Sequence, residues 1–264
     1  MCLISYGSRM CPDDEASIDS SHPRYQSLKR RRRLVSAFKD GIVVPEGLMA
    51  QGRGEMFDYL LGEETPAPAL VAEQAAAAML LLSKRPVISV NGNLAALCPK
   101  DIAALSKATG AVVEVNLFHW TKGRAKLIRE LLEAEGAQNV LSEDPDALLD
   151  GIHHDRAKCH SKGIFSADAV LIPLEDGDRA RALVDMGKKV ISIDLNPLSR
   201  TTLCATVSIV DEVTRALPNI VRFSNDLADD EKRAGQILGS YDNVKTLMAI
   251  YKQIADRFDM LAKA

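Results

Sequence analysis

Two polar loops between Pro173 and Thr202 hold most of the side chains in this sequence that could do chemistry. The first reads Leu-Glu-Asp-Gly-Asp-Arg from residue 174, and the second reads Asp-Leu-Asn-Pro-Leu-Ser-Arg-Thr from residue 194. Carboxylates such as these can accept a proton or bind a divalent cation, and amide and hydroxyl groups can hold a ligand through hydrogen bonds. The pattern favours a catalytic or ligand-binding site.

Two apolar runs must position these loops. Residues 169–174 and 189–193 are short and rich in Val, Ile and Leu, which predicts buried parallel strands that end directly before the loops. In an open parallel sheet, ligands bind in the crevice outside the carboxyl ends of the strands. We therefore expect both loops to face one crevice. The alternative is that these polar residues are ordinary turn formers.

Arginines near the N-terminus could supply positive charge for a phosphate. Arg53 lies in Gly-Arg-Gly-Glu (52–55), which we expect to introduce a helix over 56–61, so that Arg53 and the N–H groups of the helix start could meet one phosphate. The basic run 30–33 lies within a helix predicted over 25–40, so only one or two of its side chains, together with Arg24, could reach an anion. A surface turn and a solvated basic run are the alternatives.

Other familiar signatures are missing or incomplete. The sequence has no Gly-x-x-x-x-Gly-Lys-Ser/Thr and no Gly-x-Gly-x-x-Gly between a strand and a helix, which argues against a P-loop ATPase and a typical dinucleotide oxidoreductase. His153, His154, Asp155, Cys159 and His160 include residue types that bind zinc, but no second cluster completes a tetrahedral site. We interpret this segment as a loop with incidental histidines.

Strands and helices alternate from residue 86 onward, as βαβ units require. Six segments predict the strands of a mostly parallel sheet: 87–90, 111–116, 139–141, 169–174, 189–193 and 206–210. Polar residues follow five of the six, including Asn91, Asn93 and Asn116. Helices are expected at 25–40, 67–84, 99–108, 121–134, 178–186 and within 212–264.

The composition limits the class of protein. With 264 residues and 47% hydrophobic content, the chain can bury the core of one α/β domain. A formal net charge of −3 and 5% aromatic content argue against a nucleic-acid partner, and no apolar run is long enough for a transmembrane helix. Five widely spaced cysteines favour reduced thiols and a cytoplasmic protein. Residues 1–21 lack the features of a signal peptide and predict a disordered extension.

Several long motifs resemble one family. They are His-Pro-Arg-Tyr-x-Ser-Leu at 22–28, the stretch around Gly-Arg-Gly-Glu at 47–60, Ser-Val-Asn-Gly-Asn at 89–93, Glu-Val-Asn-Leu-Phe at 114–118, the whole of 173–202, and Ile-Val-Asp at 209–211. Over about residues 22–225, the chain resembles archaeal phosphopantothenate synthetase, also called 4-phosphopantoate–beta-alanine ligase.

The resemblance implies a Rossmann-like α/β fold, a three-layer α/β/α arrangement with a mostly parallel six-stranded sheet and with N-terminal and C-terminal helices. It divides the chain into a disordered N-terminal extension (1–21), an N-terminal helical segment (22–85), a Rossmann-like nucleotide-binding core (86–225) and C-terminal helices (226–264). It also implies a homodimer whose partners are otherwise small molecules.

The implied activity is an ATP-dependent amide synthesis in coenzyme A biosynthesis. 4-Phosphopantoate and beta-alanine would give 4'-phosphopantothenate, AMP and diphosphate through an acyl-adenylate. The family pattern assigns ATP contacts to Arg31, Arg53, Asp194, Leu195, Asn196, Arg200, Thr201, Glu212 and Val213.

The sequence departs from the family pattern at three places. Gln51 stands where His is usual, Glu212 where Asn is usual, and His119-Trp120 where an aromatic residue followed by Arg is common. A carboxylate at position 212 that pointed at a phosphate would repel it, whereas a contact through the backbone would be unaffected.

Such a reaction gathers several negative charges, which arginines must offset. Mg²⁺ is expected with ATP. The candidate catalytic acids, which could accept the proton of the amine or bind the metal, are Glu175, Asp176 and Asp178, and the sequence does not choose among them. Candidates for substrate binding are Arg24, Asn91, Asn93, Asn116 and Arg179. The alternatives are a non-catalytic nucleotide-binding or regulatory homologue and a Rossmann-like dehydrogenase.

Overall fold

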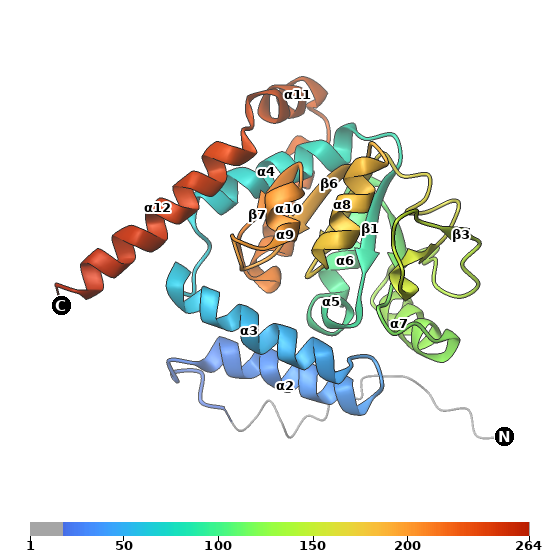
Figure 1. Ribbon diagram of the computed structural model, residues 1–264, viewed down its shortest axis with the longest axis horizontal. Helices are drawn as coiled ribbons and strands as arrows, with labels where there is room; N and C mark the ends of the chain where they lie inside the picture. The colour runs from blue at the N-terminus through green and yellow to red at the C-terminus, as the bar shows by residue number, and fades with distance from the viewer. Residues whose placement is uncertain (1–17, 264) are drawn as a thin grey trace.

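The computed structural model describes residues 18–263. Residues 1–17, which hold most of the expected N-terminal extension, and residue 264 lie outside the described residues. At the centre is a five-stranded parallel sheet in the order β2-β1-β5-β6-β7 (Figure 1). Its strands are β1 (Pro86–Val90), β2 (Val112–Val115), β5 (Ala169–Pro173), β6 (Lys189–Ile193) and β7 (Val207–Ile209).

The sixth strand that we expected at 139–141 is not part of this sheet. Leu141 makes a single parallel bridge to Glu114, with its backbone N–H donating to Val113 at 2.9 Å. Asn139 has a φ of 52°, in the left-handed region, which interrupts an extended chain. A separate antiparallel ribbon of β3 (Ala147–Leu148) and β4 (Lys158–Cys159), which the sequence pattern did not predict, follows in the chain.

Apolar side chains alternate between the two faces of the sheet, and each face has its own buried cluster. One cluster joins Ile88 and Leu171 to helices α4, α6, α7 and α10, and the other joins Val87 and Val170 to helix α8. All residues of β1 and β5 are buried, which explains their uninterrupted apolar runs. These helices are α4 (Ala67–Leu82), α6 (Pro99–Thr109), α7 (Lys122–Ala134), α8 (Gly177–Asp185) and α10 (Val213–Leu227), with the shorter α5 (Gly92–Leu97), η1 (Asp155–Ala157) and α9 (Arg200–Cys204) between strands.

Helices α2 (Tyr25–Lys39) and α3 (Pro45–Leu61) form an N-terminal hairpin, and Figure 1 shows them side by side below the sheet. The chain ends with α11 (Glu231–Ser240) and α12 (Asn243–Leu261), and the last turns of α12 run away from the rest of the molecule. Within residues 18–263, no helix combines the length and the apolar character that a membrane span needs.

The expected helix start at 52–55 is wrong, because α3 is continuous through Gly-Arg-Gly-Glu. Packing demands a small residue at Gly47, where a Cβ would lie 2.2 Å from Oδ1 of Asn93, but not at the two glycines of this motif. A Cβ at Gly54 would make ordinary contact with Cδ1 of Leu195 at 3.7 Å, and one at Gly52 would meet nothing within 4 Å. Arg53 therefore lies in the middle of a helix, without free backbone N–H groups beside it.

Gly177 allows α8 and α9 to begin close together. A Cβ at Gly177 would lie 2.4 Å from Cβ of Arg200 and 3.2 Å from the backbone N of Thr201. We expect Gly177→Ala to lower the free energy of unfolding, measured with urea, by about 1–3 kcal/mol, the usual cost of overpacking. Gly235→Ala is the control, because a Cβ at that helical position meets nothing within 4 Å. Equal effects of the two substitutions would contradict the prediction.

Candidate active site

The order of the strands marks the carboxyl ends of β1 and β5 as the place where a ligand crevice is expected. From β1 the chain proceeds to β2 on one side, whereas β5, β6 and β7 follow on the other, so the strand order reverses at this point. Ligands bind at such switch points, outside the carboxyl ends of the strands. The loops after β6 and β7 lie on one side, Asn91 and Asn116 follow β1 and β2 on the other, and the acidic loop after β5 lies between them.

The loop after β6 is folded by its own side chains. Oδ1 of Asp194 accepts a hydrogen bond from the backbone N–H of Asn196 at 2.9 Å, and burial raises the pKa of Asp194. The hydroxyl of Thr201 donates to the backbone carbonyl of Glu175 at 2.8 Å. Arg200, the first residue of α9, is exposed. Of the polar side chains that this loop brings together, that of Arg200 is thus the one most open to a ligand.

Helix α3 brings Arg53 to the same loop, because Gly54 packs on Leu195. The Arg53 side chain is exposed, and its charge partly offsets the effect of burial on the pKa of Asp194. Leu195 is buried among apolar residues, so it can offer a ligand only its backbone groups.

Arg31 is fixed on the surface of the hairpin by Glu55. Nε of Arg31 donates to Oε2 of Glu55 at 2.9 Å, Nη2 contacts the same oxygen, and the Ser27 hydroxyl donates to Oε1. Burial alone would raise the pKa of Glu55, but Arg31 and Ser27 hold it below its usual value. Close to half of the Arg31 side chain remains exposed, and Arg24, just before the first turn of α2, is also exposed.

A buried chain of ion pairs fastens this hairpin to the strand ends. Asp58 of α3 accepts from Arg30 at 3.2 Å and from Arg215 of α10 at 2.6 Å. Arg215 also donates to Asp211, at 2.6 Å, and the Thr65 hydroxyl donates to the other oxygen of Asp211 at 2.7 Å. Both aspartates are almost completely buried, so the loss of one partner would leave a charge uncompensated.

Glu212 points into the protein and caps α10. Its Oε2 accepts from the backbone N–H of Thr214 at 2.8 Å and from the Thr214 hydroxyl, and its Oε1 lies 3.8 Å from Nε of Arg30. Burial raises the pKa of Glu212, against the effects of Arg30 and Thr214. The carboxylate that departs from the family pattern is therefore occupied, and the buried Val213 beside it has no polar side-chain group.

Glu175, at the end of β5, is a buried anchor for two arginines. Its Oε2 accepts from Nη1 of Arg156 at 2.7 Å and from Nη1 of Arg179, which also donates to the Ser89 hydroxyl at 3.2 Å. Oε1 accepts from the backbone N–H of Asp176 at 2.9 Å. Arg179 is fully buried, which places its guanidinium beneath the surface of the crevice.

The other two acids of this loop are about half exposed and have different partners. Asp178 lies 3.0 Å from Nε2 of His154, and this contact and a backbone N–H outweigh burial, so that the pKa of Asp178 lies below its usual value. Asp176 lies 3.5 Å from Nε of Arg156, and burial together with the charge of Glu175 raises its pKa. Asp176 is the better placed of the two to take up a proton.

Arg156 is a site residue that the sequence analysis missed. It lies in η1 and is only 7% exposed, and its Nε has no hydrogen-bond partner among the described residues. Asn116 holds this segment by donating to the backbone carbonyls of Arg156 at 3.3 Å and Lys158 at 2.8 Å. The sequence carries little signal for Arg156, because it lies in an irregular loop without periodic pattern.

Asn91 and Asn93 are tied into the scaffold. Asn91 donates to the carbonyls of Pro173 and Leu174, at 2.9 and 3.2 Å, and its Oδ1 caps α5. Asn93 donates to the carbonyl of Gly47 at 2.8 Å. These bonds hold β1 beside β5 and hold α3 over the end of β1, so both asparagines shape the crevice through its walls.

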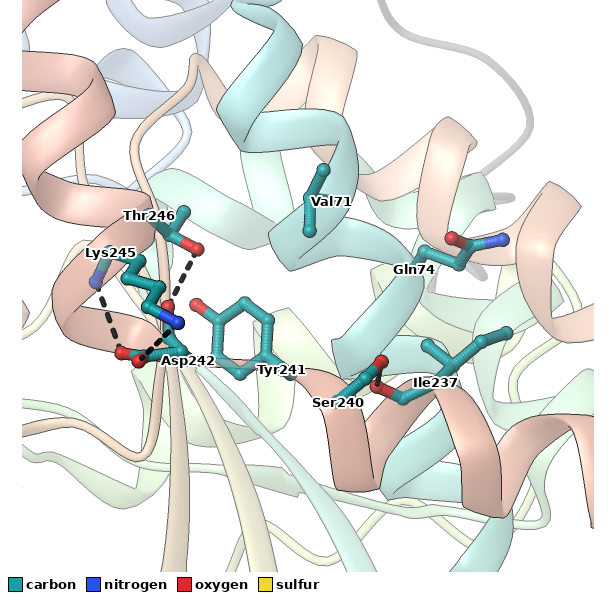
Figure 2. Close-up of a pocket in the computed structure, with 8 residues that line it drawn as sticks. All are labelled: Val71, Gln74, Ile237, Ser240, Tyr241, Asp242, Lys245 and Thr246. Atoms are coloured by element: carbon teal, nitrogen blue, oxygen red, sulfur yellow. Dashed lines mark hydrogen bonds and ion pairs between the residues drawn. The ribbon is translucent and has the colours of Figure 1, made fainter.

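The histidines and cysteine around residues 153–160 do not form a metal site. Among residues 18–263, no group of three or more His, Cys, Asp and Glu side chains is arranged to hold a metal ion, and burial raises the pKa of Cys159 to about 12. Figure 2 shows a pocket of about 230 Å³ between α4, α11 and α12, which shares no residue with the strand-end loops. It is lined by Val71, Gln74, Ile237, Ser240, Tyr241, Asp242, Lys245 and Thr246.

Glu73 of α4 is a buried acid next to Asp211, and burial together with the charge of Asp211 raises its pKa to about 9. The folded state thus keeps a proton on Glu73 that the unfolded chain releases near pH 4 to 5. Binding this proton stabilises the folded state at low pH, and the stabilisation is lost as the pH rises to about 9. We expect the free energy of unfolding of the wild type, relative to Glu73→Gln, to fall by up to about 1.4 kcal/mol per pH unit between about pH 5 and 9.

Urea unfolding at several pH values would measure this difference, with Glu64→Gln, at an exposed position, as the control for the loss of a carboxylate. If the difference in the free energy of unfolding between the wild type and Glu73→Gln stays constant over this pH range, Glu73 is not protonated in the folded state.

The chain is similar to proteins of one family. Residues 68–257 match the family described as phosphopantothenate/pantothenate synthetase. A 4-phosphopantoate–beta-alanine ligase from Methanosarcina mazei is 51% identical over 246 residues, covering 93% of this chain and 97% of its own. Ligases of the same name from Methanospirillum hungatei and Thermococcus kodakarensis are 58% and 45% identical, covering 81% and 94% of this chain and 87% and 95% of their own.

Proposed function

Because the chain belongs to the phosphopantothenate/pantothenate synthetase family, we propose that it joins 4-phosphopantoate to beta-alanine at the expense of ATP, through an acyl-adenylate. The ligase activity and its place in coenzyme A biosynthesis follow from the family and from relatives that match over most of the chain. The use of ATP, the adenylate and the assignment of residues are the proposal.

The packing of α3 on the loop after β6 is the observation that carries this proposal. It brings the exposed Arg53 beside Asp194, so a cation from the N-terminal hairpin lies near the end of β6. ATP would occupy the β6–β7 side, with Arg31, Arg53 and Arg200 around its phosphates. The acid substrate would occupy the β1–β2 side, and the acidic loop after β5 would lie between the two reactants.

In the first step, a carboxylate oxygen of 4-phosphopantoate attacks the α-phosphorus of ATP. The bond to the bridging oxygen breaks, and diphosphate leaves with that electron pair. Negative charge gathers on the α-phosphate and on the leaving group, and preorganised arginines stabilise it. Guanidinium groups suit this role because they bind phosphate oxygens through two parallel hydrogen bonds.

In the second step, the amine of beta-alanine attacks the acyl carbon and AMP leaves. The amine must first lose a proton, since its ammonium form is not a nucleophile. Glu175 has both carboxylate oxygens occupied, and Asp178 is paired with His154. We therefore assign the proton to Asp176, whose raised pKa suits a base better than an ordinary aspartate.

Mg²⁺ would come with the nucleotide. In the part of the chain that is described, no set of acidic or histidine side chains forms a metal site, so the phosphates themselves would supply most of the ligands. This agrees with the preference of Mg²⁺ for phosphate oxygens and waters. The ion would neutralise phosphate charge, and the half-exposed Asp176 and Asp178 are the acids of this loop that could hold its waters.

A second copy of the chain would cover apolar side chains that one copy leaves exposed. The hairpin exposes Met49, Met56 and Tyr59, and the end of α12 exposes Phe258, Met260 and Leu261. Large exposed apolar surfaces mark contact sites. We propose a homodimer that uses these helices, and sedimentation of the pure protein would measure its mass.

Diphosphate release tests the proposed function directly. We expect release that requires ATP, 4-phosphopantoate and beta-alanine for turnover, and AMP in equal amount. A non-catalytic homologue would release none, and a dehydrogenase would instead change nicotinamide absorbance. Either result would reject the proposed reaction.

A further inference from the structure

Three arginines gather on the β1–β5 side of the strand ends. Arg156 and Arg179 share Glu175 as their buried partner, and a third arginine, Arg124 of α7, makes no ion pair with any residue in 18–263. The half-exposed Asp176 lies 3.5 Å from Arg156, Asp178 also acts on the charge of Arg156, and Glu46 acts on that of Arg124. Buried guanidinium groups are costly without partners, so an anionic ligand would stabilise this arrangement.

Arg124 is held rigidly at the end of β1. Its Nε donates to the carbonyl of Ile42 at 2.9 Å and its Nη1 to the carbonyl of His119 at 3.0 Å. Its Nη2 lies so close to Gly92 that a Cβ there would be 2.7 Å away. Backbone carbonyls fix the direction of the side chain but do not neutralise its charge, so Arg124 is positioned in advance for an anion.

The loop after β2 links Arg124 to the segment that carries Arg156. His119 of this loop holds Arg124, and the backbone N–H of Trp120 donates to Asp155, next to Arg156, at 3.1 Å. Burial lowers the pKa of Arg124 to about 10, the charge of Arg156 adds to this shift, and that of Glu46 opposes it. The loop contacts thus bring the two guanidinium groups to the same end of the sheet, where a doubly charged anion could bind both.

We propose that Arg124 and Arg156 bind the phosphate group of 4-phosphopantoate, an inference that rests on the proposed function. Adjacent strands lie about 4.8 Å apart, so the four-carbon chain of the acid can reach from the end of β1 across β5 towards the nucleotide side. The phosphate would then lie at the β1 end, with the substrate carboxylate over the acidic loop. Arg179 positions Arg156 through Glu175 and does not itself touch the substrate.

The test is the preference of the enzyme for 4-phosphopantoate over unphosphorylated pantoate, measured as the ratio of kcat/KM values from diphosphate release. We expect Arg124→Gln to lower this ratio by about 10- to 100-fold, the effect of losing a charged hydrogen bond. KM for ATP and for beta-alanine should change less than about twofold, and Arg124→Lys should restore part of the preference. Lys126→Gln removes an exposed charge from the same helix and should leave the ratio unchanged.

Three results bear on the proposal in different ways. An unchanged ratio in Arg124→Gln, or a rise in KM confined to beta-alanine, would overturn it, the second because Arg124 would then bind the carboxylate of the amino acid. A wild type without activity on 4-phosphopantoate would instead overturn the proposed function. Urea unfolding and ATP binding of Arg124→Gln show that a lower ratio does not come from lost folding.

Discussion

Arg53→Ala should reduce the single-turnover rate of adenylate formation by about 10² to 10³-fold, the loss seen when one preorganised donor to a developing charge is removed. Arg53 is exposed and makes no ion pair with any residue in the described range, so its removal should change the free energy of unfolding by less than about 0.5 kcal/mol. Diphosphate release with ATP and 4-phosphopantoate measures the first effect, and urea unfolding measures the second.

Arg233→Ala, at an exposed position on α11, is the matched control for the loss of an arginine. It should leave both quantities unchanged. Full ATP-dependent turnover by Arg53→Ala would remove Arg53 from the mechanism. A large loss of stability would show that Arg53 supports the hairpin and not the nucleotide.

Glu175→Gln should destabilise the fold by about 3–5 kcal/mol, because it removes the one carboxylate that two buried guanidinium groups share. Oε2 of Glu175 serves Arg156 and Arg179 together, and both arginines are less than a tenth exposed. The amide of glutamine keeps the shape of the side chain but supplies no negative charge. The midpoint of urea unfolding should fall accordingly, with the slope unchanged.

Glu133→Gln removes a carboxylate from an exposed pair with Arg129, one turn away on α7. Its cost should be about 0.3–0.5 kcal/mol. If Glu175→Gln costs no more than this control, Glu175 does not neutralise Arg156 and Arg179. It would then return to the candidates for the catalytic base.

The strands and loops around the crevice could be predicted from the sequence because their signals are local. Uninterrupted apolar runs predicted the buried strands β5 and β6, and the acids and amides that follow them lie at the carboxyl edge as expected. The left-handed Gly41, with a φ of 79°, ends α2 where the pattern placed the end of that helix. Each of these features depends on a few neighbouring residues.

The buried ion pairs depend on contacts between distant segments, which a single sequence does not display. Arg30 was read as part of a basic run, although Ser27, Arg30, Leu34 and Ala37 share the buried face of α2. That spacing was the available signal, since a helix repeats its face every three or four residues. Its partner Asp58 is on another helix, and no local pattern joins the two.

Packing also overruled local propensity within α3. Glycines usually weaken a helix interior, so Gly-Arg-Gly-Glu indicated a break. The helix instead runs uninterrupted through the motif, with Gly47 packed closely against Asn93 and Gly54 in ordinary contact with Leu195. The same packing decides where Arg53 lies, which is why its neighbours could not be named from the sequence.

The attachment of the α2–α3 hairpin through Asp58 affects how mutations in this protein should be interpreted. Asp58 is buried, and its partners Arg30 and Arg215 are also part of the scaffold, yet both Arg31 and Arg53 are carried by the helices that it anchors. A substitution there would loosen at once the two cations that we propose bind the nucleotide. In a mutational screen, a substitution of Asp58 would therefore resemble the loss of a ligand contact, although the Asp58 carboxylate only attaches the hairpin to the rest of the protein.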